Sequence, residues 1–138
     1  ANRGENITMF FINNAVYGMT GGQMAPTTLI GQKTITTPEG RIAATTGAPL
    51  RICEMLKTLV RPVYIERVAV HDAHHVQRTR QAIRKACLNQ INGNGFSFVE
   101  ILSMCPTYWR MEGKDACQFV GNEMMSYYPI EKFRDASE

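Results

Sequence analysis

Short apolar runs alternate along this chain with longer stretches in which apolar and polar residues recur at helical spacing. Residues that favour β-structure predict three buried strands, at 7–12, 63–70 and 96–102. Because a helical stretch separates each strand from the next, the pattern indicates an α/β fold with a parallel sheet and right-handed crossovers. The sequence shows no internal repeat and no low-complexity segment.

Apolar periodicity also predicts the helices. One of about three turns begins at Pro49 and ends before Pro62. Asp72 is expected to cap a longer helix that Gly93 ends, and its apolar stripe comprises Val76, Ala82, Ile83, Ala86, Cys87 and Ile91. A last helix is predicted at 114–125, before the exit segment that begins at 127–129. Residues 27–46 have no period and predict a long loop, a feature that is commonly functional.

The composition excludes several classes of protein. A net charge of +3 without a block of Lys and Arg argues against a nucleic-acid partner. No apolar run is long enough for a membrane-spanning helix, and no signal-peptide pattern opens the chain. The four cysteines lack the spacing of a zinc site, and we expect reduced thiols in a cytoplasmic protein.

The loop that follows the first predicted strand carries the clearest functional signal. Two asparagines, Asn13 and Asn14, end that strand, and ligands of open α/β sheets bind beyond the carboxyl ends of the strands. Asparagine offers a neutral oxygen to a hard cation, while Gly21 and Gly22 allow the backbone to approach a ligand closely. We therefore predict a ligand site in the asparagine loop, defined as residues 13–28.

Two motifs carry a family resemblance. The run NNAVYGMTGGQMAPTT, residues 13–28, resembles the thiamin-diphosphate and Mg²⁺ loop of the β subunit of 2-oxoacid:ferredoxin oxidoreductases, and VEILSMCPTYW, residues 99–109, resembles a later motif of the same subunits. The resemblance implies the thiamin-diphosphate-binding fold. It also implies that Asn14 gives its side-chain oxygen and Val16 its main-chain carbonyl to Mg²⁺. The diphosphate and the thiazolium ring would then lie against Tyr17, Gly18, Met19 and Thr20.

The sequence departs from the family pattern in one respect. Thiamin enzymes hold Mg²⁺ from a second side through a GDG motif, and no GDG occurs in these 138 residues. We therefore expect residues 1–138 to be the C-terminal part of one thiamin-diphosphate-binding domain, which alone should bind the cofactor poorly and be inactive. Because the cofactor of such enzymes performs the chemistry and the protein positions it, the sequence assigns no general acid or base.

Cys105 has two interpretations. On the residues alone, a single cysteine is most often a small buried hydrophobe. The resemblance instead implies that Cys105, which follows the third strand and precedes Pro106, supplies one ligand of an iron–sulfur cluster in the full-length subunit. Cys53 and Cys87 are expected in the core. For Tyr108 and Trp109 the sequence leaves open a role in covering a site or filling a groove, and favours packing or a subunit interface.

The resemblance further implies oxidative decarboxylation of a 2-oxoacid to an acyl-CoA, with coenzyme A as co-substrate and electrons passed to ferredoxin. The form of the asparagine loop is closest to subunits for branched-chain substrates such as 3-methyl-2-oxobutanoate, and other subunits are the expected partners. Two alternatives stay open: a non-oxidative thiamin-dependent decarboxylase or synthase, and a non-catalytic α/β subdomain. For His71, His74 and His75 a solvated first helical turn is favoured over a metal site.

Overall fold

A computed structural model describes residues 1–136 and shows a four-stranded sheet in the order β1-β5-β4-β6. Strands β1 (Thr8–Asn13), β5 (Ser97–Leu102) and β4 (Tyr64–Ala69) run parallel, which confirms the three predicted strands and the α/β class. The fourth strand, β6 (Lys132–Asp135), pairs antiparallel with β4. The sequence pattern had placed these residues within an exit segment, so the sheet is mixed rather than fully parallel.

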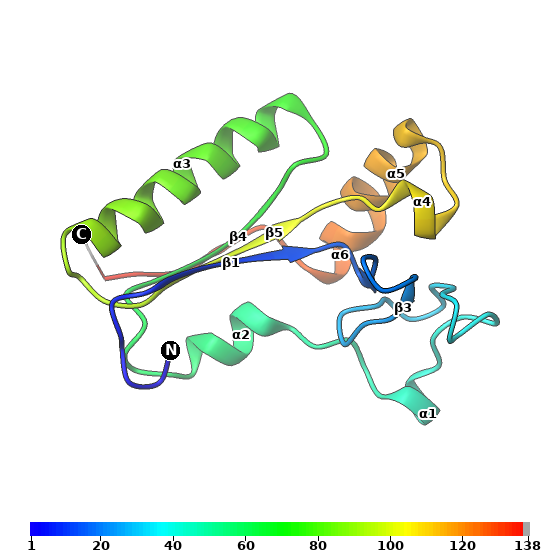
Figure 1. Cartoon of the computed structure of the whole chain (residues 1–138), viewed down its shortest axis with the longest axis horizontal. Coiled ribbons are helices and arrows are strands. Elements are labelled where there is room, and N and C mark those ends of the chain that lie inside the picture. The colour runs from blue at the N-terminus through cyan, green and yellow to red at the C-terminus, as the bar shows by residue number, and fades with distance from the viewer. Residues whose placement is uncertain (137–138) are drawn as a thin grey trace.

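Helices cover both faces of the sheet (Figure 1). The long α3 (Ala73–Ile91) lies across one face and packs with β4 and β5 around Tyr64, Val68, Ala82, Ala86, Val99 and Ile101. The short α2 (Ile52–Lys57) lies under the other face, where Cys53 packs with Ile65, Phe96, Phe98 and Phe133. Every residue of β4 and β5 is buried, as expected for parallel strands covered on both sides.

Several helical expectations need correction. Helix α2 has six residues rather than three turns, because Pro49 and Leu50 precede the helix and Arg51, with an extended backbone, is its N-cap. The buried face of α3 includes Thr79 and Asn89, whereas Ile91 is 77% exposed. Thr79 is tolerated inside because its hydroxyl donates to the Ala69 carbonyl at 2.7 Å. Cys53 is buried as predicted, while Cys87 is only half-buried.

Strand β1 is not the fully buried strand that its composition suggested. It forms one edge of the described sheet, and Met9, Phe10 and Ile12 are 40–55% exposed. An apolar strand with an unpaired edge is a ready template for pairing with another strand.

The C-terminal third of the chain connects the sheet to the asparagine loop. Helix α4 (Pro106–Trp109) follows β5, and the predicted last helix is observed as α5 (Gly113–Phe119), a π-helical turn (Val120–Met124) and α6 (Met125–Tyr127). These helices enclose a third core, to which the asparagine loop contributes Ala15 and Val16. The buried residues of this core are Ala15, Val16, Leu29, Ala69, Leu102, Trp109, Ala116, Val120, Met124 and Tyr128. The predicted long loop is confirmed, with only α1 (Ala43–Thr46) and two isolated bridges as regular structure.

Candidate functional site

The carboxyl ends of β1 and β5 lie side by side. Asn13, the last residue of β1, is in register with Leu102, the last residue of β5, and the Ser103 N–H donates to the Asn13 carbonyl at 3.0 Å. The asparagine loop therefore leaves the sheet next to the segment that carries Cys105. The sheet thus brings the two motifs singled out in the sequence to one place.

A buried turn shapes the start of the loop. The Asn13 side-chain oxygen accepts a hydrogen bond from the Ala15 N–H at 3.1 Å, and Ala15 has a φ of +57°. That left-handed conformation is uncommon for a residue other than glycine. Thr28 holds the other side of Ala15, because its hydroxyl donates to the Ala15 carbonyl at 2.6 Å. Ala15 is 1% exposed, so the turn is fixed inside the protein.

Asn14 and Val16, the predicted Mg²⁺ ligands, flank this turn. The Asn14 side-chain oxygen accepts from the Val16 N–H at 3.3 Å, which is long for such a bond. The Asn14 carbonyl accepts from Trp109 Nε1 at 3.1 Å. Asn14 is half-buried and the Val16 side chain is buried. Hydrogen bonds within the protein therefore fix the positions of both residues.

Gly18 brings the two motifs into contact. A Cβ atom at Gly18 would lie 3.3 Å from both Asn14 Nδ2 and Cys105 Sγ. The absence of a side chain at Gly18 thus allows the thiol and the asparagine amide to approach the same point. A Cβ at Gly22 would lie 2.4 Å from the Tyr108 ring, so Tyr108 lies directly against the loop backbone. Tyr108 and Trp109 were predicted in packing without a named partner, and both contact the asparagine loop.

The rest of the loop is a small hairpin of β2 (Val16–Tyr17) and β3 (Gln23–Met24). Tyr17 is 51% exposed and Met19 is fully exposed at the tip. Thr20 is also exposed, and its hydroxyl donates to the Gln23 side chain at 2.8 Å. The residues expected to contact the diphosphate and the thiazolium ring therefore lie on one accessible hairpin.

A cavity of about 310 Å³ lies beside the start of the loop. Its lining combines the end of β1 with the asparagine loop and the approach to α2: Phe11, Ile12, Asn13, Asn14, Val16, Tyr17, Ala25, Pro26, Thr27, Leu50 and Ile52. A largely apolar pocket with a few amide and carbonyl groups is typical of a small-molecule site.

Arg41 orders the long loop that supports this hairpin, and its role was not predicted from the sequence. Arg41 is 4% exposed, and its guanidinium donates to main-chain carbonyls on both sides of the loop. The acceptors are Ala25, Pro26, Thr28, Thr46, Gly47 and Ala48, at 2.7–3.4 Å. The sequence could have indicated this role, because Arg41 is the one arginine in a segment rich in Thr and Gly, and the main-chain carbonyls of such a loop need donors.

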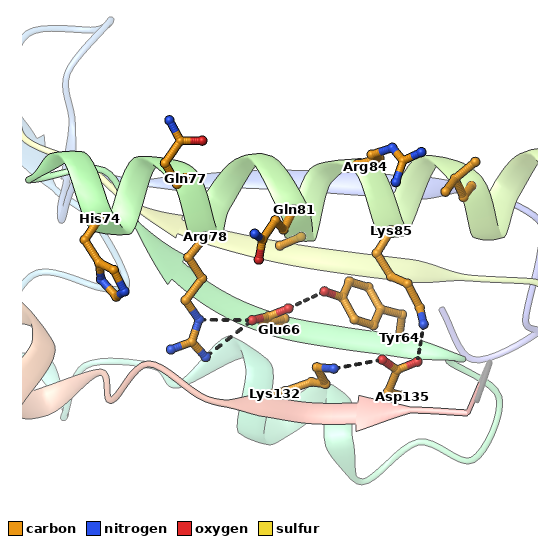
Figure 2. A pocket seen from close by; sticks show the side chains of 12 residues that line it. Tyr64, Glu66, His74, Gln77, Arg78, Gln81, Arg84, Lys85, Lys132 and Asp135 are labelled. Carbon is orange, nitrogen blue, oxygen red and sulfur yellow. Dashed lines mark hydrogen bonds and ion pairs between the residues drawn. The ribbon is translucent and has the colours of Figure 1, made fainter.

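A larger groove of about 650 Å³ lies between α3, β4 and β6 (Figure 2). Glu66 accepts from Arg78 and from the Tyr64 hydroxyl, and both Lys85 and Lys132 approach Asp135. The carboxylates that face this groove are thus already paired with groups of the protein. We therefore place the candidate site at the strand ends and not in this groove.

The histidines after β4 form a compact cluster. Asp72 caps α3 as predicted, since its carboxylate accepts from the His75 N–H at 2.8 Å. The ligand atoms of His71, Asp72 and His75 lie within 4.8 Å of one another, a spacing that suits a metal ion, whereas His74 is exposed. Burial, followed by the neighbouring His75, lowers the pKa of His71. The preference for a solvated first turn stays a prediction.

The asparagine loop at the end of β1 and the segment after β5 thus form one candidate site, in a chain that also matches a known family. Residues 1–101 match the family model described as the thiamine pyrophosphate enzyme, C-terminal TPP binding domain. The chain belongs to this family of thiamin-diphosphate-binding domains, and the fold class is the one predicted.

The relatives narrow the class. The chain is 50% identical over 137 residues to ketoisovalerate oxidoreductase subunit VorA of Methanothermobacter thermautotrophicus, covering 99% of this chain and 29% of the relative. It is 39% identical over 107 residues to 2-oxoglutarate synthase subunit KorB of Methanocaldococcus jannaschii, covering 78% of this chain and 35% of the relative. The chain thus spans about a third of the length of these curated relatives.

A solved structure shares the fold. The 2-oxoglutarate:ferredoxin oxidoreductase from Magnetococcus marinus, solved with 2-oxoglutarate, coenzyme A and succinyl-CoA bound, superposes with a TM-score of 0.63 at 19% identity. The match covers all of this chain and 50% of that chain. Within residues 1–136, no helix is both long and apolar enough to cross a membrane.

Proposed function

We propose that residues 1–138 form the C-terminal part of one thiamin-diphosphate-binding domain in a subunit of a 2-oxoacid:ferredoxin oxidoreductase. The observation that carries the proposal is the junction at Gly18. There, Asn14 of the asparagine loop and Cys105 of the segment after β5 both lie 3.3 Å from the point that a Cβ atom would occupy. The 50% identity to a ketoisovalerate oxidoreductase subunit over nearly the whole chain supports it.

The residues of the loop fit Mg²⁺ and a diphosphate. Asn14 offers a side-chain oxygen whose present hydrogen bond is long, and Val16 offers a main-chain oxygen on the same turn. Both are neutral hard donors of the kind that Mg²⁺ accepts beside phosphate oxygens. Residues 13–28 contain no acidic side chain, so the remaining charge compensation must come from the diphosphate and from a carboxylate elsewhere in the domain.

The hairpin tip would then hold the organic part of the cofactor. In this proposal Tyr17, Gly18, Met19 and Thr20 lie against the diphosphate and the thiazolium ring, which agrees with the accessible position of the hairpin. When bound, thiamin diphosphate supplies an electron sink for the decarboxylation of a 2-oxoacid, while the protein supplies binding and orientation. The fixed turn at Ala15 orients the metal-binding oxygens before the cofactor arrives.

Cys105 is proposed as one ligand of an iron–sulfur cluster in the complete subunit. Its thiol is half-buried, is not in a disulfide, and lies beside Gly18. A cluster held there would adjoin the cofactor and would take up the electrons released when the product of decarboxylation is oxidised to the acyl group. Ferredoxin is the proposed acceptor, coenzyme A the co-substrate, and a branched-chain 2-oxoacid such as 3-methyl-2-oxobutanoate the substrate, in a cytoplasmic complex with other subunits.

Two variants of the complete subunit test this function. Asn14→Ala should weaken Mg²⁺-dependent binding of thiamin diphosphate several-fold or more, measured by calorimetric titration. Cys105→Ser should lower the iron content and the visible absorbance without a matching loss of cofactor affinity. Unchanged affinity in Asn14→Ala would exclude Asn14 as a ligand.

The same preparation separates the alternatives. A complete subunit that binds the cofactor but contains no iron would favour a non-oxidative thiamin enzyme. A complete subunit that binds no thiamin diphosphate would favour a non-catalytic subdomain. In the complex assembled with its other subunits, rates of ferredoxin reduction with 3-methyl-2-oxobutanoate, 2-oxoglutarate and pyruvate then decide the substrate, and the branched-chain acid is expected to be fastest.

A further inference from the structure

A buried carboxylate lies behind the asparagine loop. Glu100, in the middle of β5, is 0% exposed and accepts three hydrogen bonds. The donors are Asn13 Nδ2 at 2.8 Å, Arg67 Nε at 2.8 Å and Cys53 Sγ at 3.2 Å. Buried carboxylates need such partners, and Arg67 supplies a positive charge that Glu100 shares with Glu54. This charged centre therefore contacts Asn13, the first residue of the asparagine loop.

The contact with Glu100 fixes which way the Asn13 amide points. A carboxylate only accepts and a main-chain N–H only donates. Asn13 lies between the two, with Nδ2 toward Glu100 and Oδ1 toward the Ala15 N–H. The reverse orientation would place two donors together at Ala15 and two acceptors together at Glu100. The negative charge on β5 therefore selects the orientation that closes the turn.

That turn sets the geometry of the proposed metal ligands. The hydrogen bond from Ala15 to Asn13 holds Ala15 at a φ of +57°, and Ala15 joins Asn14 to Val16. A relaxed Ala15 would rotate the Asn14 side chain relative to the Val16 carbonyl. The Thr28 hydroxyl holds only the carbonyl side of Ala15, so the N–H side depends on Asn13.

We propose that Glu100 is a positioning residue for the cofactor site: through Asn13 it holds the Ala15 turn, so that the Asn14 and Val16 oxygens are placed for Mg²⁺. This inference rests on the proposed function of the asparagine loop. Glu100 does not itself contact the cofactor in this scheme. Glu100 acts through the amide side chain of Asn13 alone. Replacing its carboxylate by an isosteric amide should therefore disturb the site.

The chain offers a matched control in Glu54. Arg67 is paired with two carboxylates, since its Nη1 and Nη2 donate to Glu54 at 3.0 and 2.6 Å while its Nε donates to Glu100. Glu100→Gln and Glu54→Gln each remove one negative charge from the same guanidinium. Only Glu100→Gln presents a donor to Asn13. If the amide oxygen introduced by Glu100→Gln keeps the Arg67 contact, its amide nitrogen turns toward Asn13 Nδ2 and forces the Asn13 amide to rotate.

The experiment measures the Mg²⁺ dependence of thiamin-diphosphate binding in the complete subunit, by calorimetry at fixed cofactor concentration, together with a thermal melt. Glu100→Gln should raise the apparent Kd for Mg²⁺ by about tenfold or more, the usual effect of losing an outer-sphere partner of a metal ligand. Glu54→Gln should change that Kd less than about twofold, because Asn13 keeps its partner Glu100 in this variant. Both variants should melt at a lower temperature than the wild type.

Turnover separates positioning from a general loss of structure. At saturating Mg²⁺ and cofactor, kcat of the assembled complex that carries Glu100→Gln should return toward that of the wild-type complex, because the site can still be filled. Should Glu100→Gln fail to fold, Asn13→Ala carries the same test, since it keeps the pair of Glu100 and Arg67 and should show the same loss of Mg²⁺ affinity.

The outcomes are distinguishable. Equal Kd values for Glu100→Gln and Glu54→Gln, or wild-type affinity in Asn13→Ala, would overturn the positioning role while Asn14→Ala still weakens binding. No Mg²⁺-dependent binding in the wild type, or none lost in Asn14→Ala, would instead overturn the proposed function of the loop.

Discussion

Trp109 Nε1 donates a hydrogen bond of 3.1 Å to the main-chain oxygen of Asn14, across 95 positions of the sequence. The bond joins the short helix α4 after β5 to the loop after β1. Trp109 is 8% exposed and its ring lies against Phe119, with centroids 4.9 Å apart. The asparagine loop is thereby tied to the C-terminal helices as well as to the sheet.

Replacing Trp109 by Phe should loosen the loop without emptying the core. The phenyl ring keeps much of the contact with Phe119, but the Asn14 carbonyl loses its donor. This acceptor is part-buried, so leaving it unpaired costs at most about 1–3 kcal/mol, the range for a buried group. We expect a lower melting temperature and several-fold weaker binding of thiamin diphosphate to the complete subunit, both measured on the same preparation. Wild-type cofactor affinity in Trp109→Phe would show that this tie does not support the site.

Gly18 should be intolerant of even a methyl group. A Cβ there would lie 3.3 Å from Asn14 Nδ2 and Cys105 Sγ, tighter than ordinary packing, so one of them must move. We expect Gly18→Ala to reduce both cofactor affinity and iron content, measured by calorimetry and metal analysis. Gly113→Ala is the control, because nothing lies within 4 Å of a Cβ at that position. Equal behaviour of the two variants would contradict a close approach at Gly18.

The elements that carry a clear period were predictable. The three parallel strands appear within a residue or two of their predicted bounds, and Asp72 caps α3 as expected. Position along the chain also revealed the strand-end loop, because the asparagines interrupt an apolar run. Helix α2 was overestimated because apolar spacing continued into Leu59 and Val60, where the chain has already left the helix. Local pattern alone does not show where tertiary packing ends a helix.

The sequence does contain an indication of the charged centre behind the loop, but the apolar character of the surrounding strands obscures it. Glu66, Arg67 and Glu100 interrupt runs that otherwise predict buried strands. A charge within such a run must be paired, so these positions indicate an internal ion network. Which charges pair could not be derived, because Arg67 meets Glu54 and Glu100 from two other elements. The contacts of Trp109 and Arg41 with distant carbonyls depend in the same way on the folded arrangement.

Cys53 should be the least reactive of the four thiols. It is 0% exposed, and burial, followed by the charge of Glu100, raises the pKa of its thiol well above the usual range. Because the thiolate is the reactive form, we expect iodoacetamide to modify Cys53 at least about tenfold more slowly than Cys87 in the native protein. Peptide mass spectrometry measures the rates, and all four cysteines should react alike in guanidinium chloride. Comparable native rates at positions 53 and 87 would argue against the packing around Cys53.

Asp72 should make the protein sensitive to acid in a defined range. The hydrogen bond from the His75 N–H, followed by that from the His75 side chain, lowers the pKa of Asp72 from 3.8 to about 2. Because the folded-state pKa lies below the unfolded one, the charged carboxylate stabilises the fold above pH 3.8, and this contribution is lost as the pH falls toward 2. Asp72→Asn keeps an N-cap acceptor but has no charge to lose. The difference in melting temperature between wild type and Asp72→Asn should therefore shrink between pH 4 and pH 2, about the interval that the two pKa values span. A difference that stays constant over this range would mean that the Asp72 charge does not stabilise α3.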